Sequence, residues 1–375
     1  PAGGPAPRRG TRSAALAAAG IAACVPAVAD AQETDSGQAN VQAAKEEETQ
    51  RFVPAKLKRG NKIKEVFLIE RKGDEIVYRF DKEQDVTATL KIAEIQAAKF
   101  DLDFDESAYY EALADAAWID AATILFEAVV PAMPFIDLPH NNIAPLALEA
   151  AGRIMRGAAG KRGGVAVKPE NNAAKKEYRA AYNILRGLHE ATWFEDVDEV
   201  RFRSVLCLVM QGRIGEAEEA FEKWPEPVMG ETAYAYYSLA KAHLALQEDE
   251  YRKAMDAVVQ SLVFETKDLD TFPESLLLSA LCYEKLGEWH RARDVYFEVA
   301  RLFQQYHWAD HGVERLRYIM DEGLTAEEED ADLRKIFFGV NENMNEKVSS
   351  FLASRDGEGE QEETEDPDKQ AKDKK

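Results

Sequence analysis

One internal pattern constrains the fold of this chain more than any other feature. At four places a small residue stands four positions before a larger apolar residue, and the intervals between successive small residues are 36, 37 and 38. These small residues are Ala181, Ala217, Ala254 and Ala292. Residues 211–221 and 286–296 also share a glycine that closes one helix and an apolar residue two positions later. A repeat of this length predicts stacked helical hairpins, because one hairpin alone cannot bury its apolar face.

These repeats resemble the tetratricopeptide repeat (TPR) family, whose units are helix-turn-helix hairpins of about 34 residues. The strongest match starts at residues 279–283, and its later positions are Leu286, Gly287, Trp289, Ala292 and Tyr296. Two further matches lie at residues 204–221 and 239–258, and degenerate outer repeats are expected at 109–130 and 173–190. The chain departs from the family at His243, Leu208 and Gln247. The resemblance implies a right-handed α-solenoid of stacked hairpins.

A different pattern precedes the helical region. Residues 66–69, 76–80 and 86–92 are β-branched and aromatic runs of ordinary strand length, and Gly73 between the first two suits a tight turn. They predict a small antiparallel β module over residues 51–104, which needs the following helices to cover its apolar face. The predicted fold is therefore mainly α, with TPR-like repeats over residues 105–324 and this β module before them.

The first 31 residues predict export. Three arginines precede an uncharged apolar stretch, residues 13–29, and small-residue cleavage sites follow, as in a secretory signal peptide. An alternative is a lipoprotein signal, because residues 21–24 resemble a bacterial lipobox that ends in Cys24. Cys24 would then carry a membrane tether, and we expect no other membrane span. Both readings predict a protein of the periplasm or cell envelope.

The remaining segments and the charge complete the organisation. Residues 32–50 predict a disordered tether, residues 325–354 a C-terminal helical segment and residues 355–375 a disordered acidic tail. The net charge is −22, which argues against binding of nucleic acid. Two basic islands interrupt the acidic background, at residues 51–64 and 151–176. Both could meet an anionic partner or pair with the protein's own acidic helices.

Motifs for catalysis, cofactors and metals do not assemble in the sequence. Residues 157–164 are rich in glycine but lack the spacing and the Ser/Thr of a phosphate-binding loop, and we expect a flexible insertion there. His307 and His311 lie one helical turn apart, but Trp308 stands where a zinc protease needs glutamate. Cys207 and Cys282 share a repeat position with Ala242, which predicts buried small residues and no disulfide. We expect no enzyme activity, no cofactor and no metal.

The TPR resemblance instead implies a partner-binding groove along the first helix of each hairpin. Its predicted lining is Phe202, Leu206, Val209, Tyr234, Tyr237, Lys241, Leu244, Leu277 and Leu281. Such a wall suggests docking of an extended peptide or an amphipathic helix. Alternatively, the groove is filled by the β module, by residues 336–338 or by a second copy of the chain.

The sequence thus predicts a non-enzymatic scaffold or adaptor for a protein or peptide partner, with self-association open. Two other functions stay open as well. One is a lipoprotein component of an envelope or outer-membrane assembly complex. The other is an envelope enzyme or glycan-binding protein whose site lies between the β module and the helices.

Overall fold

A computed structural model describes residues 52–83, 85–162, 164, 168–189, 191–264, 269–304 and 306–325. The predicted signal peptide, the tether and the acidic tail lie outside these ranges, as do Cys24 and residues 336–338. Only the first residue of the predicted C-terminal helical segment is described. The chain forms two compact units, Pro1–Leu286 and Gly287–Lys375.

The first unit begins with a five-stranded antiparallel sheet in the order β4-β3-β2-β1-β5. The strands are β1 (Val53–Arg59), β2 (Lys62–Lys72), β3 (Glu75–Arg79), β4 (Ala88–Lys91) and β5 (Ala97–Phe100). Gly60 and Gly73 have positive φ and make the two tight turns that join β1, β2 and β3. The predicted antiparallel β module is confirmed, but its first and last strands, β1 and β5, were not predicted.

Side chains alternate between the two faces of the sheet, and one face is buried. Val53, Ala55 and Leu57 of β1 lie on this inner face with Val66 and Leu68 of β2, and all five are at most 5% exposed. Helices cover this face, as the sequence predicted. One hydrophobic core runs from the sheet into the helices of the first unit.

The edge strand β5 is tied directly to the helical part. The amide of Phe100 donates to Asn142 Oδ1 at 2.7 Å, and Asn142 Nδ2 donates to the carbonyl of Phe100 at 3.0 Å. The amide of Ala98 donates to the carbonyl of Pro139 at 3.1 Å, and the ring of Phe100 stacks on Phe135. This edge is therefore covered by paired polar groups as well as by apolar packing.

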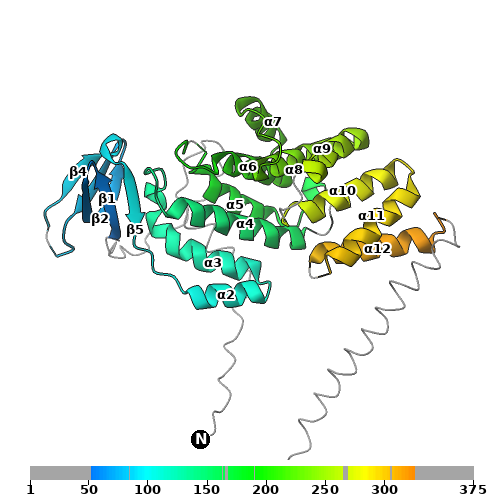
Figure 1. Ribbon diagram of the computed structural model, residues 1–375, viewed down its shortest axis with the longest axis horizontal. Coiled ribbons are helices and arrows are strands. Elements are labelled where there is room, and N and C mark those ends of the chain that lie inside the picture. The colour runs from blue at the N-terminus through cyan, green and yellow to red at the C-terminus, as the bar shows by residue number, and fades with distance from the viewer. Residues whose placement is uncertain are drawn as a thin grey trace, which may run out of the picture. The chain divides into compact units, whose positions relative to one another are not determined.

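Helices follow the sheet in the described part of the first unit (Figure 1). They are α2 (Glu106–Ala114), α3 (Trp118–Val129), α4 (Ile143–Lys161), α5 (Lys175–Arg186), α6 (Val197–Gln211), α7 (Ile214–Lys223), α8 (Thr232–Gln247), α9 (Tyr251–Phe264) and α10 (Phe272–Lys285). The short 3₁₀ helices are η1 (Ile92–Glu94), η2 (Val130–Phe135) and η3 (Pro169–Asn171). The second unit contains α11 (Trp289–Leu302) and α12 (His307–Asp321), which pack on each other.

Helices that follow one another in the chain pack in pairs, from α2 with α3 up to α9 with α10. The exception is α7, because α6 packs mainly on α8 and α7 stands out to one side (Figure 1). The prediction of a mainly α chain with an N-terminal antiparallel sheet is confirmed.

The helix-ending glycine and the small buried positions of the repeats behave as predicted. Gly212 caps α6 with a left-handed backbone, φ +81°. Cys207, Ala242 and Cys282 are fully buried, and the two cysteines are free thiols. One expectation was wrong. Residues 157–161 are not a flexible insertion but the last residues of α4.

A second expectation also needs correction, since one helical stretch is long and apolar enough to cross a membrane. It is Trp118–Phe135, with a mean hydropathy of 1.3, and it comprises α3 and η2. In this structure 44% of the stretch is buried, and Ala122, Leu125 and Val129 pack in the hydrophobic core. Its apolar composition is accounted for by that core, which also includes α4.

Candidate functional site

The predicted groove residues fall into two groups in the structure. Leu244 and Leu281 are partly exposed and Lys241 is exposed. The other six are buried, namely Phe202, Leu206, Val209, Tyr234, Tyr237 and Leu277.

The chain's own aromatic side chains cover part of this predicted wall. The ring centroid of Phe202 lies 6.3 Å from that of Phe221 in α7 and 6.4 Å from that of Trp224 just after it. Phe221 also meets the ring of Tyr237, at 5.5 Å. Thus α7 and the segment after it pack against part of the predicted wall.

The polar ends of the predicted groove residues form a separate layer. The hydroxyl of Tyr237 donates to Glu226 Oε2 at 2.6 Å, and Lys241 Nζ bonds to the same hydroxyl. The hydroxyl of Tyr234 donates to Gln260 Oε1 at 2.6 Å, which links α8 to α9. Burial and the bond to Glu226 both raise the pKa of Tyr237, so this hydroxyl stays protonated and donates.

Four exposed apolar side chains lie close in sequence to residues of this polar layer. Val228 and Met229, in the segment that leads into α8, are 65% and 55% exposed. Val259 and Val263, one helical turn apart on α9 and on either side of Gln260, are 42% and 64% exposed. We call these four residues, with Glu226, Lys241 and Gln260, the α8–α9 surface.

A second candidate lies inside the helices, where three charged or polar side chains meet. Arg162, just after α4, contacts Glu274 of α10, with 2.6 Å between Nη2 and Oε1. His243 of α8 contacts the same carboxylate oxygen through Nε2 at 2.7 Å. Each of the three is at most 6% exposed.

The protonation states of this cluster follow from its surroundings. Burial alone would raise the pKa of Glu274, but Arg162 and His243 offset it and lower that pKa to about 2. Burial lowers the pKa of His243, despite its carboxylate partner. At neutral pH we therefore expect an Arg162–Glu274 ion pair to which a neutral His243 donates a hydrogen bond.

The remaining donors of Arg162 are also bonded. Nε donates to the carbonyl of Gly164 at 2.9 Å, and Nη1 lies 3.3 Å from Met210 Sδ. A covered and internally paired cluster fits a structural link between helices better than a reactive site. Sequence reasoning missed it because Glu274 follows Arg162 by 112 residues. The one available signal was His243, which stands where the TPR pattern favours tyrosine.

The basic island at residues 151–176 is largely paired with the protein's own acids, one of the two alternatives left open. Its ion pairs are Arg153–Glu149, Arg156–Asp270, Lys161–Glu177 and Arg162–Glu274. His307 and His311 both lie on α12, where each ring is near that of Trp308. Within the part of the chain that the structure describes, no group of three or more His, Cys, Asp or Glu is placed to hold a metal ion.

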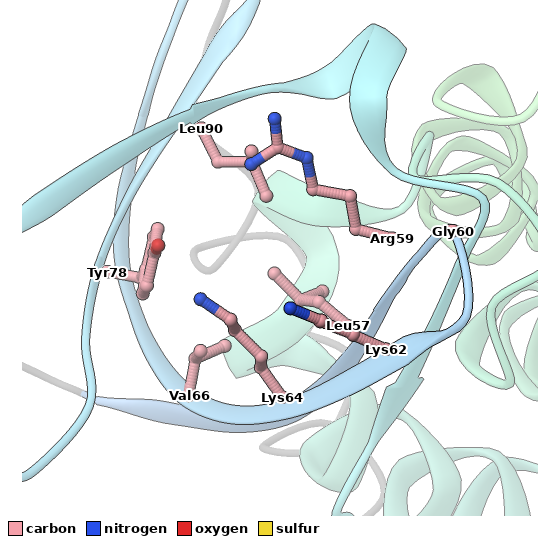
Figure 2. Close-up of a pocket in the computed structure, with 8 residues that line it drawn as sticks. All are labelled: Leu57, Arg59, Gly60, Lys62, Lys64, Val66, Tyr78 and Leu90. Carbon is pink, nitrogen blue, oxygen red and sulfur yellow. The ribbon is translucent and has the colours of Figure 1, made fainter.

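A third candidate is a cavity of about 430 Å³ in the β sheet (Figure 2). Its residues come from the inner face of the sheet near the β1–β2 turn, which contains Gly60. They are Leu57, Arg59, Gly60, Lys62, Lys64, Val66, Tyr78 and Leu90. The basic island at residues 51–64 therefore contributes three cationic side chains to one concave site.

Comparison of the chain with models of known families, with curated proteins and with solved structures finds no match. The structure thus supports stacked, sequentially packed helices that follow a five-stranded sheet, and it assigns no family.

Proposed function

We propose that this chain is a non-catalytic adaptor, built from TPR-like hairpins and exported to the periplasm or cell envelope. It binds a protein partner through the α8–α9 surface. The observation that carries this proposal is the exposure of Val228, Met229, Val259 and Val263 around one helical hairpin. A contiguous exposed apolar patch marks an interaction site, whereas scattered apolar side chains do not, and the proposal takes these four to form one patch on the α8–α9 hairpin.

The chemistry of the surface suggests the form of the partner. The apolar side chains can bury against an amphipathic helix or an extended peptide, while Lys241, Glu226 and Gln260 can bond to its polar groups. The predicted groove residues then act indirectly. Tyr237 bonds to Glu226 and Lys241 of this surface, and the ring of Phe202 packs on that of Tyr237.

The buried cluster supports the non-catalytic part of the proposal. An acid–base site must reach its substrate, whereas Arg162, Glu274 and His243 are covered and bonded to one another. The lipoprotein alternative depends on Cys24, which lies outside the described residues. Labelling of cells with a radioactive fatty acid distinguishes a lipoprotein from an unlipidated exported protein. Only a lipoprotein becomes labelled, and Cys24→Ala should abolish that label.

The test is proximity crosslinking in the native cell with the full chain. We expect the double variant Val228→Asp/Val263→Asp to lose its crosslinked partner, since two charges would enter the apolar contact. Ile63→Asp/Val86→Asp is the matched control, because it adds the same two charges at side chains that are 68% and 72% exposed in the sheet region. Each substitution at an exposed position usually changes the free energy of unfolding by no more than about 0.5 kcal/mol, so both variants should fold.

Two outcomes would contradict the proposal. One is a partner that persists unchanged in the double variant. The other is an equal loss in Ile63→Asp/Val86→Asp, which would show a general effect of added negative charge. Leu206→Asp and Tyr237→Asp are poor probes of the same surface, because both residues are buried and an unpaired buried charge would unfold the helices.

A further inference from the structure

The cavity in the sheet joins two kinds of wall. Leu57, Val66 and Tyr78 form an apolar base, and each is at most 8% exposed. Arg59, Lys62 and Lys64 stand at the rim, because β1 and β2 place them on the inner face beyond the point where the helices cover it. Figure 2 shows both lysine side chains pointing into the same opening.

The charges at this rim are not balanced. Arg59 has its own partner, Glu94. Lys62 and Lys64 have no carboxylate partner among the residues that the structure describes, and Lys64 lies 5.1 Å from the ring centroid of Phe80. Two such ammonium groups at one cavity, in a chain of net charge −22, make a local site that attracts an anion.

The apolar base adds a second requirement on the ligand. A simple inorganic anion would leave Leu57, Val66 and Leu90 without contacts, whereas a ligand with an apolar body would cover them. The volume of about 430 Å³ lies in the usual range of small-molecule sites, about 300 to 1,000 Å³. The hydroxyl of Tyr78, also on the wall, has no hydrogen-bond partner within the described ranges and can bond to a polar head group.

We propose that this cavity binds a small anionic amphiphile, in which an apolar body carries one carboxylate. The apolar body lies on Leu57, Val66 and Leu90, and the carboxylate lies between Lys62 and Lys64. The site is separate from the α8–α9 surface, and its function does not depend on that surface. A flat anionic membrane fits the geometry less well, because the cationic side chains point into a cavity.

Titration calorimetry of the full chain with 4-butylbenzoate and its neutral counterpart 4-butylbenzamide tests the proposal. We expect the carboxylate to bind at least about tenfold more tightly than the amide, and this difference to shrink as salt is added. Lys62→Gln/Lys64→Gln should weaken carboxylate binding about tenfold and leave amide binding unchanged. Leu90→Trp, which fills the cavity and keeps its charge, should abolish binding of both compounds.

The matched control is Lys58→Gln/Lys99→Gln, which removes the same charge from the outer face of the same sheet. An equal loss of carboxylate binding in this control would overturn the proposal, as would equal affinity for acid and amide. Absence of any binding at millimolar 4-butylbenzoate would also overturn it. If the chain instead binds phosphatidylglycerol vesicles but not 4-butylbenzoate, and Lys62→Gln/Lys64→Gln stops that binding, a membrane surface is the partner and the cavity proposal fails.

Discussion

At the scale of single residues, the burial of Arg162 carries a large desolvation penalty. A guanidinium that is 1% exposed loses nearly all of its hydration, and only strong partners offset that loss. Glu274 supplies the opposite charge, and Gly164 and Met210 take two further donors. The ion pair therefore contributes little net stability, because its attraction mainly offsets the desolvation of the two charges. Removal of one member alone should lower stability strongly, because it leaves the other charge buried and unpaired.

The variant Arg162→Met tests this asymmetry. It leaves Glu274 buried beside His243 without a full positive charge, and we expect the free energy of unfolding to fall by about 3–5 kcal/mol. The double variant Arg162→Met/Glu274→Leu should recover much of the loss, because no buried charge remains. Urea denaturation of the wild type, both single variants and the double variant measures the coupling. A double variant less stable than either single variant would contradict this account.

The pH dependence of stability should report His243. Its pKa is lowered from 6.5 in the folded chain, so below about pH 6.5 protons bind the unfolded chain more readily and stability falls. The depressed pKa of Glu274 adds a second loss as the pH drops below 4.5 toward 2. Thermal unfolding at pH 7.5 and 5.5 should show a smaller drop in Tm for His243→Gln than for the wild type. Equal drops would remove His243 as the cause.

At the scale of elements, the close approach of α3 and α4 depends on glycine. A Cβ at Gly157 would lie 2.7 Å from Ile119 Cδ1 and 2.8 Å from its Cγ1, within the core. A Cβ at Gly152 would meet only the guanidinium end of Arg203, a long side chain that can move. Both glycines lie on α4, so the same substitution at each position compares a contact with Ile119 in the core with a contact with the end of Arg203.

Alanine in place of glycine inside a helix is worth about 1 kcal/mol by propensity, while overpacking a core costs about 1–3 kcal/mol. We therefore expect Gly157→Ala to lower the stability of the chain and Gly152→Ala to leave it unchanged or raise it. Chemical denaturation followed by circular dichroism compares the two. A gain in stability for Gly157→Ala would show that Ile119 moves freely.

The elements also show what the sequence could and could not reveal. Helical periodicity was sufficient to predict the helical region, and Gly212 was sufficient to predict where α6 ends. Strand β1 was missed because its outward lysines, at Lys56 and Lys58, gave it the appearance of a basic loop. The sequence also does not show which of two adjacent asparagines caps α4. In the structure Asn141 Oδ1 accepts hydrogen bonds from the first amides of α4, and Asn142 bonds to β5.

The candidate sites were less predictable than the elements. Repeat register identified Phe202 and Tyr237 as one face, but register alone does not reveal that Phe221 covers them. The sheet cavity combines residues from β1 to β4, whose pairing depends on strand register that single runs of sequence do not specify. The basic island at residues 51–64 was visible, yet its concave placement was not.

At the scale of the whole molecule, the sheet and the helices of the first unit share one core. We expect them to unfold together, since separation would expose Phe100, Phe135 and Leu138 and break both hydrogen bonds of Asn142. Native-state hydrogen exchange should give the amides of β1 and β2 the same opening free energy as those of α3 and α4. A smaller opening free energy for the strands would mean that the sheet is an independent module.

The link between Arg162 and Glu274 also bears on the order in which the chain is made. Synthesis proceeds from the N-terminus, so α4 to α9 leave the ribosome before the carboxylate that compensates Arg162 exists as part of the chain. Until α10 is synthesised and packs on the other helices, Arg162 either stays in contact with water or is buried without a carboxylate partner. Docking of α10 therefore closes the interior around Arg162 at a late stage of synthesis, and a nascent chain released earlier should stay accessible to proteases.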